Sequence, residues 1–460
     1  MQLNKELYDY LEKVIEISRQ KMAKYLNSGN FSENIDEDKI NYVRAIRSAI
    51  YTVDRPDGIP FEEEDIKEYI VYAFDRVFPG RLGPLEPLLK DNNVTEIMVN
   101  AYNDIWVETG GQLKPAEVSF FNDEDVKNTI RRITEADGRT CDDAHPFCDC
   151  ILQRAPGDVG GGSRVNCMIP PISLDHPVID IRKFKSELTT MEALKKVGTV
   201  DDNVIEFINA LVAARFNIIV AGGTGSGKTT MVNAVSNEIP NGERIITIED
   251  NAELQLHAKH VLRWQARPAN TEGSGEITIR QLVKNALRQR PDRIVVGEVR
   301  GAETLDMLRA MSTGHDGSLT TVHATSSKKT LSQINLLIGY AEDCPTDKDD
   351  KKTLISDAVD IVIYLKRFSD GRRRIEEIRE VNSYVPGSNV FSTTLLWSFV
   401  ENAEIVKEDE VTGEVYTEEY TGLTPTGSTM SEEHLNKFET AGIEFKHKWI
   451  EPVVSNVNVY

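Results

Sequence analysis

The sequence predicts an α/β protein whose main domain is built on a parallel sheet, with a small α+β domain and a helical region before it. Between residues 191 and 381, apolar segments of roughly four residues alternate with helical patterns, as in the βαβ units of a parallel sheet. Before that region, the short strand patterns 96–100 and 104–108 lack this alternation, which favours an α+β arrangement. From Leu3 to Phe78 the apolar residues recur at helical spacing, which indicates helices.

The order of these patterns predicts four regions. We expect a helical N-terminal region over residues 1–80, an α+β domain over 81–190, the α/β domain over 191–381 and a C-terminal extension over 382–460. The extension alternates Thr, Val, Tyr and acidic residues around turns, and we interpret it as a small β-rich or mixed addition of unknown role. A chain of 460 residues is too long for one ordinary hydrophobic core, so several domains are expected.

The composition is that of a water-soluble globular protein. Hydrophobic residues make up 40% and charged residues 28% of the chain, which excludes a disordered or fibrous protein. Acidic residues number 74 against 53 basic ones, and the net charge of −21 disfavours nucleic acid as a partner. Apolar runs fall short of the roughly 20 residues that cross a bilayer, and the N-terminus lacks an export-signal pattern, so we expect a cytoplasmic protein.

Four of the five cysteines lie close together, at Cys141, Cys148, Cys150 and Cys167. They are too few and too irregularly spaced for a secreted disulfide framework, so reduced thiols are the expected state. Together with His145 the group could also bind a soft metal. However, the single residue between Cys148 and Cys150 fits no common structural zinc site.

The main chemical signal is a glycine-rich loop between a predicted strand and a predicted helix. The strand 217–221 leads directly into Gly222, and Gly227, Lys228 and Thr229 complete the spacing G-x-x-x-x-G-K-[ST]. Glycines let the backbone curl so that its N–H groups face phosphate oxygens, and the following helix adds the positive end of its dipole. A glycine-rich turn that only packs tightly would not need the Lys and the Thr. The sequence therefore predicts a P-loop that binds ATP with Mg²⁺.

Three side chains of this loop have expected roles. Lys228 would reach the β and γ phosphates, the Thr229 hydroxyl would ligate Mg²⁺, and Thr230 would support the α-phosphate end. The expected nucleotide-binding residues are Gly223, Thr224, Gly225, Ser226, Gly227, Lys228, Thr229 and Thr230.

Two carboxylates follow strands of the same predicted sheet, where parallel sheets place their ligand chemistry. Glu249 comes directly after an apolar strand. It is expected to position Mg²⁺, directly or through water, although it could instead cap the next helix. Glu298 follows another strand and Gly297, and it is expected to polarise the attacking water. Because Gly297 stands where an Asp commonly lies, Thr229 and water would carry more of the magnesium coordination.

Two histidines flank a further apolar strand, 319–322. His323 follows the strand and His315 precedes it. A histidine at a strand end near the γ-phosphate could sense that phosphate by hydrogen bonding and pass the signal to neighbouring elements. A lone histidine is more often structural. We expect His323 to act in the site, and both roles stay open for His315.

Together these segments resemble a known family. Four of them are similar in order and spacing to the Walker A, Asp, Walker B and His boxes of the type II/type IV secretion ATPase superfamily: 222–230, 248–250, 293–301 and 314–324. Upstream segments resemble its tight-adherence (Tad) pilus assembly branch: 83–89, 96–100, 164–166, 169–171 and 181–184. The resemblance covers about residues 83 to 381.

The resemblance implies a RecA-like P-loop NTPase core behind a PAS-like α+β domain, assembled as a homohexamer that hydrolyses ATP. Each nucleotide would lie between the two domains, with arginines as fingers at the γ-phosphate. The matching positions are Arg154, Arg164 and Arg182. The family also implies a polytopic inner-membrane platform protein as partner and a peripheral position on the inner face of the cell membrane. Pilin or a secreted protein would be moved indirectly.

Two other functions are compatible with a RecA-like core. A nucleic-acid translocase of a conjugation-type system would bind single-stranded DNA with steep salt dependence, which the acidic net charge disfavours. A nucleotide-gated scaffold would bind ATP without turnover, which the carboxylate at Glu298 disfavours.

Overall fold

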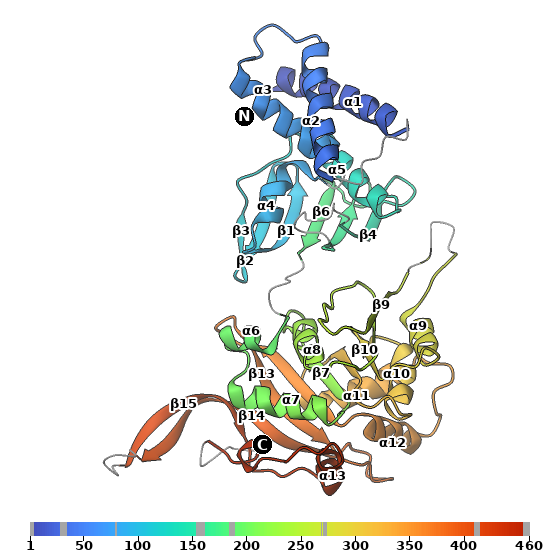
Figure 1. Cartoon of the computed structure of the whole chain (residues 1–460), viewed down its shortest axis with the longest axis vertical. Coiled ribbons are helices and arrows are strands. Elements are labelled where there is room, and N and C mark those ends of the chain that lie inside the picture. Colours follow the sequence, from blue (N-terminus) through green and yellow to red (C-terminus); the bar gives the residue numbers. More distant parts are fainter. Residues whose placement is uncertain are drawn as a thin grey trace. The chain divides into compact units, whose positions relative to one another are not determined.

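The computed structural model describes most of the chain as two compact units, Met1–Lys185 and Ser186–Tyr460. The described residues are 4–27, 35–78, 81–152, 162–183, 189–267, 269, 274–408 and 415–453. Each unit has hydrophobic cores of its own (Figure 1).

The first unit begins with three helices that pack on one another. They are α1 (Lys5–Asn27), α2 (Ile35–Thr52) and α3 (Glu63–Val77). Each helix buries one apolar stripe, and Leu11, Ile46 and Tyr69 belong to their shared core. Neither these helices nor the others in the described residues are both long and apolar enough to span a membrane.

A six-stranded antiparallel sheet forms the rest of the first unit, in the order β3-β2-β1-β6-β5-β4. Alternate residues of its strands face the core, where Ile97, Val165 and Ile181 are buried. The elements are η1 (Gly83–Leu85), α4 (Glu86–Lys90), β1 (Val94–Ala101), β2 (Asp104–Thr109), β3 (Gln112–Pro115), α5 (Asp123–Ala136), β4 (Phe147–Ile151), β5 (Arg164–Met168) and β6 (Val178–Arg182).

Three cysteines belong to the core of this sheet. Cys148, Cys150 and Cys167 are buried, and all five cysteines are free thiols. Cys148 lies opposite Cys167 in the β4–β5 ladder. Burial raises the pKa of the partly exposed Cys141 to about 11. Among the described residues, no group of three His, Cys, Asp or Glu side chains is placed to hold a metal ion.

The second unit is built on a nine-stranded sheet in the order β15-β14-β13-β12-β7-β11-β10-β8-β9. The pairs from β12 to β9 are parallel, and those from β12 to β15 are antiparallel. The strands are β7 (Ile218–Gly222), β8 (Ile245–Glu249), β9 (Val261–Gln265), β10 (Arg293–Val296), β11 (Leu319–His323), β12 (Ile361–Arg367), β13 (Arg373–Val381), β14 (Thr393–Glu408) and β15 (Val415–Pro425). The helices are α6 (Met191–Lys196), α7 (Asp202–Ala213), α8 (Lys228–Ser236), α9 (Ile279–Ala286), α10 (Glu303–Met311), α11 (Ser327–Ile338), α12 (Lys348–Ala358), α13 (Glu432–Thr440) and η2 (His447–Trp449).

Helices cover both faces of this sheet. Alternate residues of β7 belong to two different cores: Ile218 and Val220 to the core shared with α7 and α8, and Ile219 and Ala221 to the core shared with α10 and α11. Coverage on both faces accounts for the unbroken apolar run of this strand. The expected α/β fold, with a parallel sheet around the P-loop, is confirmed.

The strands after residue 381 extend this same sheet. β14 pairs with β13, and β15 pairs with β14. The outer parts of β14 and β15 reach away from the rest of the unit as a two-stranded ribbon (Figure 1). Trp397, Phe438 and Trp449 are buried in the core that also contains α7 and α8. Residues beyond 381 therefore contribute to the same core as the P-loop strand.

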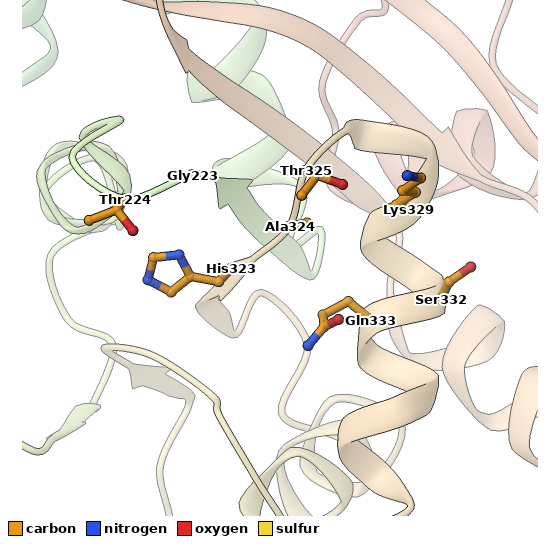
Figure 2. A pocket seen from close by; sticks show the side chains of 8 residues that line it. All are labelled: Gly223, Thr224, His323, Ala324, Thr325, Lys329, Ser332 and Gln333. Carbon is orange, nitrogen blue, oxygen red and sulfur yellow. The ribbon is translucent and has the colours of Figure 1, made fainter.

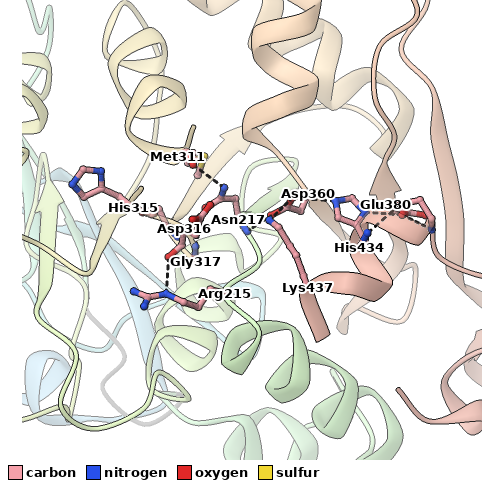
Figure 3. Close-up of polar contacts among 12 residues, drawn as sticks. Arg215, Asn217, Met311, His315, Asp316, Gly317, Asp360, Glu380, His434 and Lys437 are labelled. Atoms are coloured by element: carbon pink, nitrogen blue, oxygen red, sulfur yellow. Dashed lines mark hydrogen bonds and ion pairs between the residues drawn. The ribbon is translucent and has the colours of Figure 1, made fainter. Parts of the chain in front are cut away.

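A buried network of charged side chains fastens α13 to the sheet (Figure 3). His434 lies between two carboxylates, with Nδ1 at 2.6 Å from Glu380 and Nε2 at 3.0 Å from Asp360. Lys437 donates to both oxygens of Asp360, at 2.8 and 2.7 Å. Asp360 also accepts a hydrogen bond of 2.7 Å from the amide of Asn217, which precedes β7. The network thus connects α13 to the start of the P-loop strand.

Candidate nucleotide-binding site

The glycine-rich loop joins the end of β7 to the start of α8. Gly225 and Gly227 have φ angles of 68° and 94°, a region that glycine adopts without steric cost. A side chain at Gly222 is excluded, because its Cβ would lie 2.4 Å from the Leu365 carbonyl oxygen. The glycines therefore hold the backbone in a tight curl. Thr229 and Thr230, both half-buried, lie in the first turn of α8.

Inside the loop, one carbonyl oxygen gathers several donors. The Gly223 oxygen accepts hydrogen bonds from the Ser226 hydroxyl at 2.9 Å and from the Lys228 ammonium at 3.1 Å. The Ser226 amide also points at it, at 3.4 Å. Amide and ammonium groups in such a loop are the donors that bind phosphate. A phosphate oxygen would offer them the same contact with a full negative charge.

A row of polar side chains runs from Lys228 across the ends of two neighbouring strands. Lys228 Nζ lies 3.3 Å from Nδ1 of His323, the last residue of β11. His323 Nε2 lies 3.0 Å from Oε1 of Glu298, just beyond β10. The other oxygen of Glu298 accepts a hydrogen bond of 2.5 Å from Arg300. Since β7, β11 and β10 are adjacent and parallel, their carboxyl ends bring these residues to one edge of the sheet.

The surroundings of His323 favour its neutral form. Burial and the neighbouring Lys228 lower its pKa, while Glu298 acts in the opposite direction. Within the described residues, Glu298 Oε1 has no aligned hydrogen-bond donor despite its 3.0 Å distance from His323 Nε2. A neutral imidazole can donate with one nitrogen and accept with the other. His323 is therefore placed to respond to a change of charge beside Lys228.

Glu249 combines a structural contact with an unused oxygen. It ends β8 and is 3% exposed. Its Oε1 accepts hydrogen bonds of 2.9 Å from the Glu253 and Leu254 amides. These amides lie in the loop between β8 and β9, so the alternative that Glu249 caps the next helix is wrong. Its Oε2 is buried and has no hydrogen-bond partner in the part of the chain that the structure describes. Burial raises the pKa of Glu249 to about 7, although the two amides act to lower it.

Gly297 makes room for the Glu249 side chain. A Cβ at Gly297 would lie 3.1 Å from Glu249 Cγ, closer than an ordinary van der Waals contact. The Gly297 amide donates to the Ile248 carbonyl oxygen at 2.9 Å, so the two strand ends lie close together. The glycine at the position where an Asp commonly stands therefore gives the buried carboxylate of β8 its space.

A cavity of about 600 Å³ opens beside the loop. Its size is within the range of small-molecule sites. Figure 2 shows the His323 ring extending toward Thr224 of the loop, whereas Lys329, Ser332 and Gln333 come from α11. The cavity is lined by Gly223, Thr224, His323, Ala324, Thr325, Lys329, Ser332 and Gln333. It extends the P-loop site toward β11 and α11.

His315 is not part of this row. It precedes β11, so the length of that strand separates it from His323 and from the P-loop edge of the sheet. Its carbonyl oxygen accepts a hydrogen bond of 2.7 Å from the Ser318 hydroxyl. The role near the γ-phosphate that the sequence left open for His315 does not fit this position.

The arginines expected as fingers are not in the second unit. Arg164 begins β5 and Arg182 ends β6, directly opposite each other in the ladder of the first unit. Both are exposed, and Arg182 Nε lies 3.8 Å from Glu96 Oε1. Arg154 lies outside the described residues. Neighbouring guanidinium groups suit a phosphate, and their action at the nucleotide stays a prediction.

Two arginines of the site were missed from the sequence. Arg300 pairs with Glu298 and also lies 3.9 Å from Asp250. It could have been found, because it follows Glu298 by two positions. Arg373 donates to the Gly225 carbonyl oxygen at 2.7 Å from a position 148 residues further along the chain. Local spacing gave no signal for that contact.

The arrangement suits a polyphosphate with a divalent cation. The curled loop and Lys228 supply amide donors and positive charge. Thr229 and Glu249 Oε2, which has no hydrogen-bond partner among the described residues, offer oxygen ligands of the kind that Mg²⁺ takes. A buried carboxylate oxygen without a partner is costly unless a cation or water occupies the adjacent space. The residues present therefore fit magnesium-bound ATP.

Comparisons with known proteins place these residues in a family context. The family model described as type II/IV secretion system protein matches residues 80–367. A Mycobacterium tuberculosis protein named for conjugal transfer is 37% identical over 296 residues, which are 64% of this chain and 83% of that protein. An uncharacterized protein of Methanocaldococcus jannaschii is 41% identical over 247 residues, 52% of this chain and 33% of that protein. The crystal structure of the VirB11 ATPase from the Brucella suis type IV secretion system is 26% identical, with a TM-score of 0.35, over 64% of this chain and 91% of that one.

The family match spans the parts of the chain that carry the site. It begins in the first unit, ends with the last residue of β12, and covers more than half of the sequence. The P-loop, Glu249, Glu298 and His323 all lie within it. The chain therefore belongs to the type II/IV secretion system protein family.

Proposed function

We propose that this chain is an ATPase that hydrolyses magnesium-bound ATP at its P-loop to power pilus assembly, pilus retraction or protein secretion. The observation that carries the proposal is the row from Lys228 through His323 to Glu298, which joins a phosphate-binding lysine to a carboxylate at one edge of the sheet. Phosphoryl transfer depends on such positioning and electrostatic stabilisation. Several relatives are named as type IV secretion system proteins, and these names support a role in secretion.

The residues of the site have distinct tasks in this reaction. The loop amides and Lys228 bind the β and γ phosphates. Glu298 orients and polarises the attacking water, and Arg300 fixes the orientation of its carboxylate. His323 lies between them and connects the phosphate side to the water side. Thr229, and Glu249 directly or through water, would hold Mg²⁺, which would neutralise charge on the phosphates.

The working assembly in this proposal is a homohexamer on the inner face of the cell membrane. ATP and ADP would differ in affinity for open and closed arrangements of the two units, and that difference converts hydrolysis into motion. Arg164, Arg182 and Arg154 would complete the site as fingers. A polytopic inner-membrane platform protein would receive the motion, and pilin or a secreted protein would be moved indirectly. The segments that resemble the tight-adherence branch, such as 83–89, favour that branch.

A second candidate is a RecA-like nucleic-acid translocase of a conjugation-type system. The name of the Mycobacterium tuberculosis relative, which refers to conjugal transfer, favours it. The net charge of −21 opposes long-range attraction to phosphates of DNA. Salt-dependent binding of single-stranded DNA by the purified protein would support this candidate over the first.

The proposed function is tested by the variant Glu298→Gln. The amide keeps the size of the side chain but cannot act as a base, so ATP binding should persist while hydrolysis falls by about 100-fold or more. Calorimetry measures binding and phosphate release measures turnover. Glu342→Gln, at an exposed carboxylate beyond α11, is the matched control and should change neither. Normal hydrolysis by Glu298→Gln would refute the assigned role, and wild-type protein that binds no ATP would refute the function.

A further inference from the structure

The hairpin formed by β12 and β13 lies beside the P-loop. Leu365 of β12 pairs with Gly222 at the end of β7. Its carbonyl oxygen leaves no room for a side chain at Gly222. The hairpin turn is closed by two backbone hydrogen bonds of 2.9 Å between Phe368 and residues 371 and 372. The turn is thus held next to the start of the loop.

Further contacts make this turn rigid. Arg374 donates to both carboxylate oxygens of Asp370, at 3.1 and 2.6 Å. The Arg374 guanidinium also lies over the rings of Phe368 and Phe399, at 5.3 and 5.4 Å from their centroids. On the other side, the Thr199 hydroxyl donates to the Arg373 carbonyl oxygen at 2.9 Å. The backbone of Arg373 therefore has a fixed position.

From this position Arg373 reaches the P-loop. Its Nε donates a hydrogen bond of 2.7 Å to the Gly225 carbonyl oxygen. Its Cδ lies 3.4 Å from the place where a Cβ on Gly227 would be. The side chain thus lies against the loop, where it contacts the backbone at Gly225 and passes close to Gly227.

The contact fixes the direction of one amide. The Gly225 carbonyl and the Ser226 N–H belong to one planar trans peptide, so they point in opposite directions. With the carbonyl held outward by Arg373, the Ser226 N–H points into the loop, where it faces the Gly223 oxygen at 3.4 Å. A charged donor on the carbonyl also polarises the peptide and strengthens the N–H as a donor.

We propose that Arg373 is a positioning residue of the nucleotide site, which holds the Gly225–Ser226 peptide in the orientation that presents the Ser226 amide to phosphate. The inference rests on the proposed function, because it concerns the same ligand. Arg373 lies beyond residue 367, where the family match ends, so the matched motifs do not contain this contact. Its effect is on the affinity for the phosphate chain and not on the water-activating step.

The test compares Arg373→Gln with Arg372→Gln in the full-length chain. Arg372 is the exposed residue just before β13, so it controls for loss of one positive charge. Calorimetry is run with magnesium ATP and with magnesium tripolyphosphate, and turnover is measured in parallel. Because a charge-assisted hydrogen bond is lost, Arg373→Gln should lower the affinity for both ligands by about 10-fold. KM for ATP should rise by a similar factor, and kcat should stay within about 2-fold of the wild-type value. Arg372→Gln should bind both ligands as the wild type does.

Arg373→Lys provides a second variant. Lysine keeps the charge and can still donate to the Gly225 carbonyl, so its affinity should lie between those of the wild type and Arg373→Gln. Wild-type affinity in Arg373→Gln, or an equal loss in Arg372→Gln, would overturn the inference. A lower affinity for ATP with an unchanged affinity for tripolyphosphate would also overturn the inference, because Arg373 would then affect binding of the base or ribose and not of the phosphates. Wild-type protein that binds neither ligand would instead refute the proposed function itself.

Discussion

The two ends of strand β7 use their polar groups in opposite ways. At its start, the Asn217 side chain is fully engaged: its oxygen accepts from the Gly317 and Ser318 amides at 2.9 and 3.1 Å, and its nitrogen donates to the Met311 carbonyl at 3.2 Å. Beyond its other end, the donors of the P-loop converge on the single carbonyl oxygen of Gly223. The first end is arranged to hold the fold, and the second keeps donors that a ligand can use.

The same contrast governs the titratable groups. Near the start of β7, burial alone would lower the pKa of His434, but the hydrogen bonds with Asp360 and Glu380 outweigh it and raise the pKa to about 9. Near the P-loop, burial is the dominant cause that raises the pKa of Glu249 to about 7. One shift comes from completed ion pairs, and the other from a carboxylate whose second oxygen has no described partner. Only the shift of the Glu249 pKa is typical of a functional site that binds a cation.

The largest expected effect is on turnover, and it comes from a substitution at the P-loop end of β7. Lys228→Ala removes the ammonium that we propose to contact the phosphates, and kcat/KM for ATP should fall by about 1,000-fold or more. The thermal unfolding midpoint should stay close to that of the wild type, because Lys228 belongs to neither hydrophobic core of the second unit. Phosphate release and a melting curve measure the two quantities. Lys196→Ala, an exposed lysine at the end of α6, is the control, and unchanged turnover in Lys228→Ala would break the comparison.

The next effect concerns stability and its pH dependence. Because the folded pKa of His434, about 9, exceeds its unfolded value near 6.5, its stabilising effect is complete below about pH 6.5 and is lost as pH rises through 9. His434→Gln should lower the free energy of unfolding by about 3 kcal/mol at pH 6, since each pKa unit corresponds to about 1.4 kcal/mol.

Denaturant unfolding of wild type and His434→Gln across pH 6 to 10 measures this effect. The difference between the two proteins should shrink between about pH 6.5 and 9 and be small above pH 9. His447→Gln, at a side chain that is 80% exposed, should show no such difference. A constant gap between wild type and His434→Gln at every pH would contradict the paired state of the histidine.

The smallest effect tests the space around Glu249. Gly297→Ala places a Cβ 3.1 Å from Glu249 Cγ, so one side chain must shift by a few tenths of an ångström, at a cost of about 1 kcal/mol. Turnover should fall severalfold with little change in stability. In a Glu249→Ala background the same substitution should have no further effect, because the crowded atom is gone. Additive losses in the double variant would show that Gly297 acts independently of Glu249.

Local sequence patterns predicted the strands and the loop at the P-loop edge of the sheet. The loop 222–230 and the strands before Glu249, Glu298 and His323 lie where their apolar runs and glycines indicated. This part was predictable because each motif is contiguous and each strand is an unbroken apolar run. The alternative that Glu249 caps the next helix was wrong, because a loop and then β9 follow β8, and Glu249 Oε1 accepts from two amides of that loop. The finger roles of the arginines stay predictions.

Contacts between distant segments were not predictable in this way. His434 meets Asp360 and Glu380 from 74 and 54 positions away, and nothing in the local spacing of these residues marks them as partners. The extension after residue 381 alternates polar and β-branched residues, which indicates strands but not the sheet that they join. Its strands β14 and β15 continue the nine-stranded sheet. The division into four regions stays a prediction, because the compact units of the structure number two.

The continuation of the sheet beyond β12 has a practical consequence for where this polypeptide can be cut. The family match stops at residue 367, yet β13 pairs along β12 and Trp397 and Phe438 fill the core beneath β7. A fragment that stopped at 367 would carry an open strand edge and a bare apolar face, both of which promote aggregation. The segment that carries the P-loop is therefore not an autonomous folding unit, because strands beyond residue 367 complete its sheet and its core.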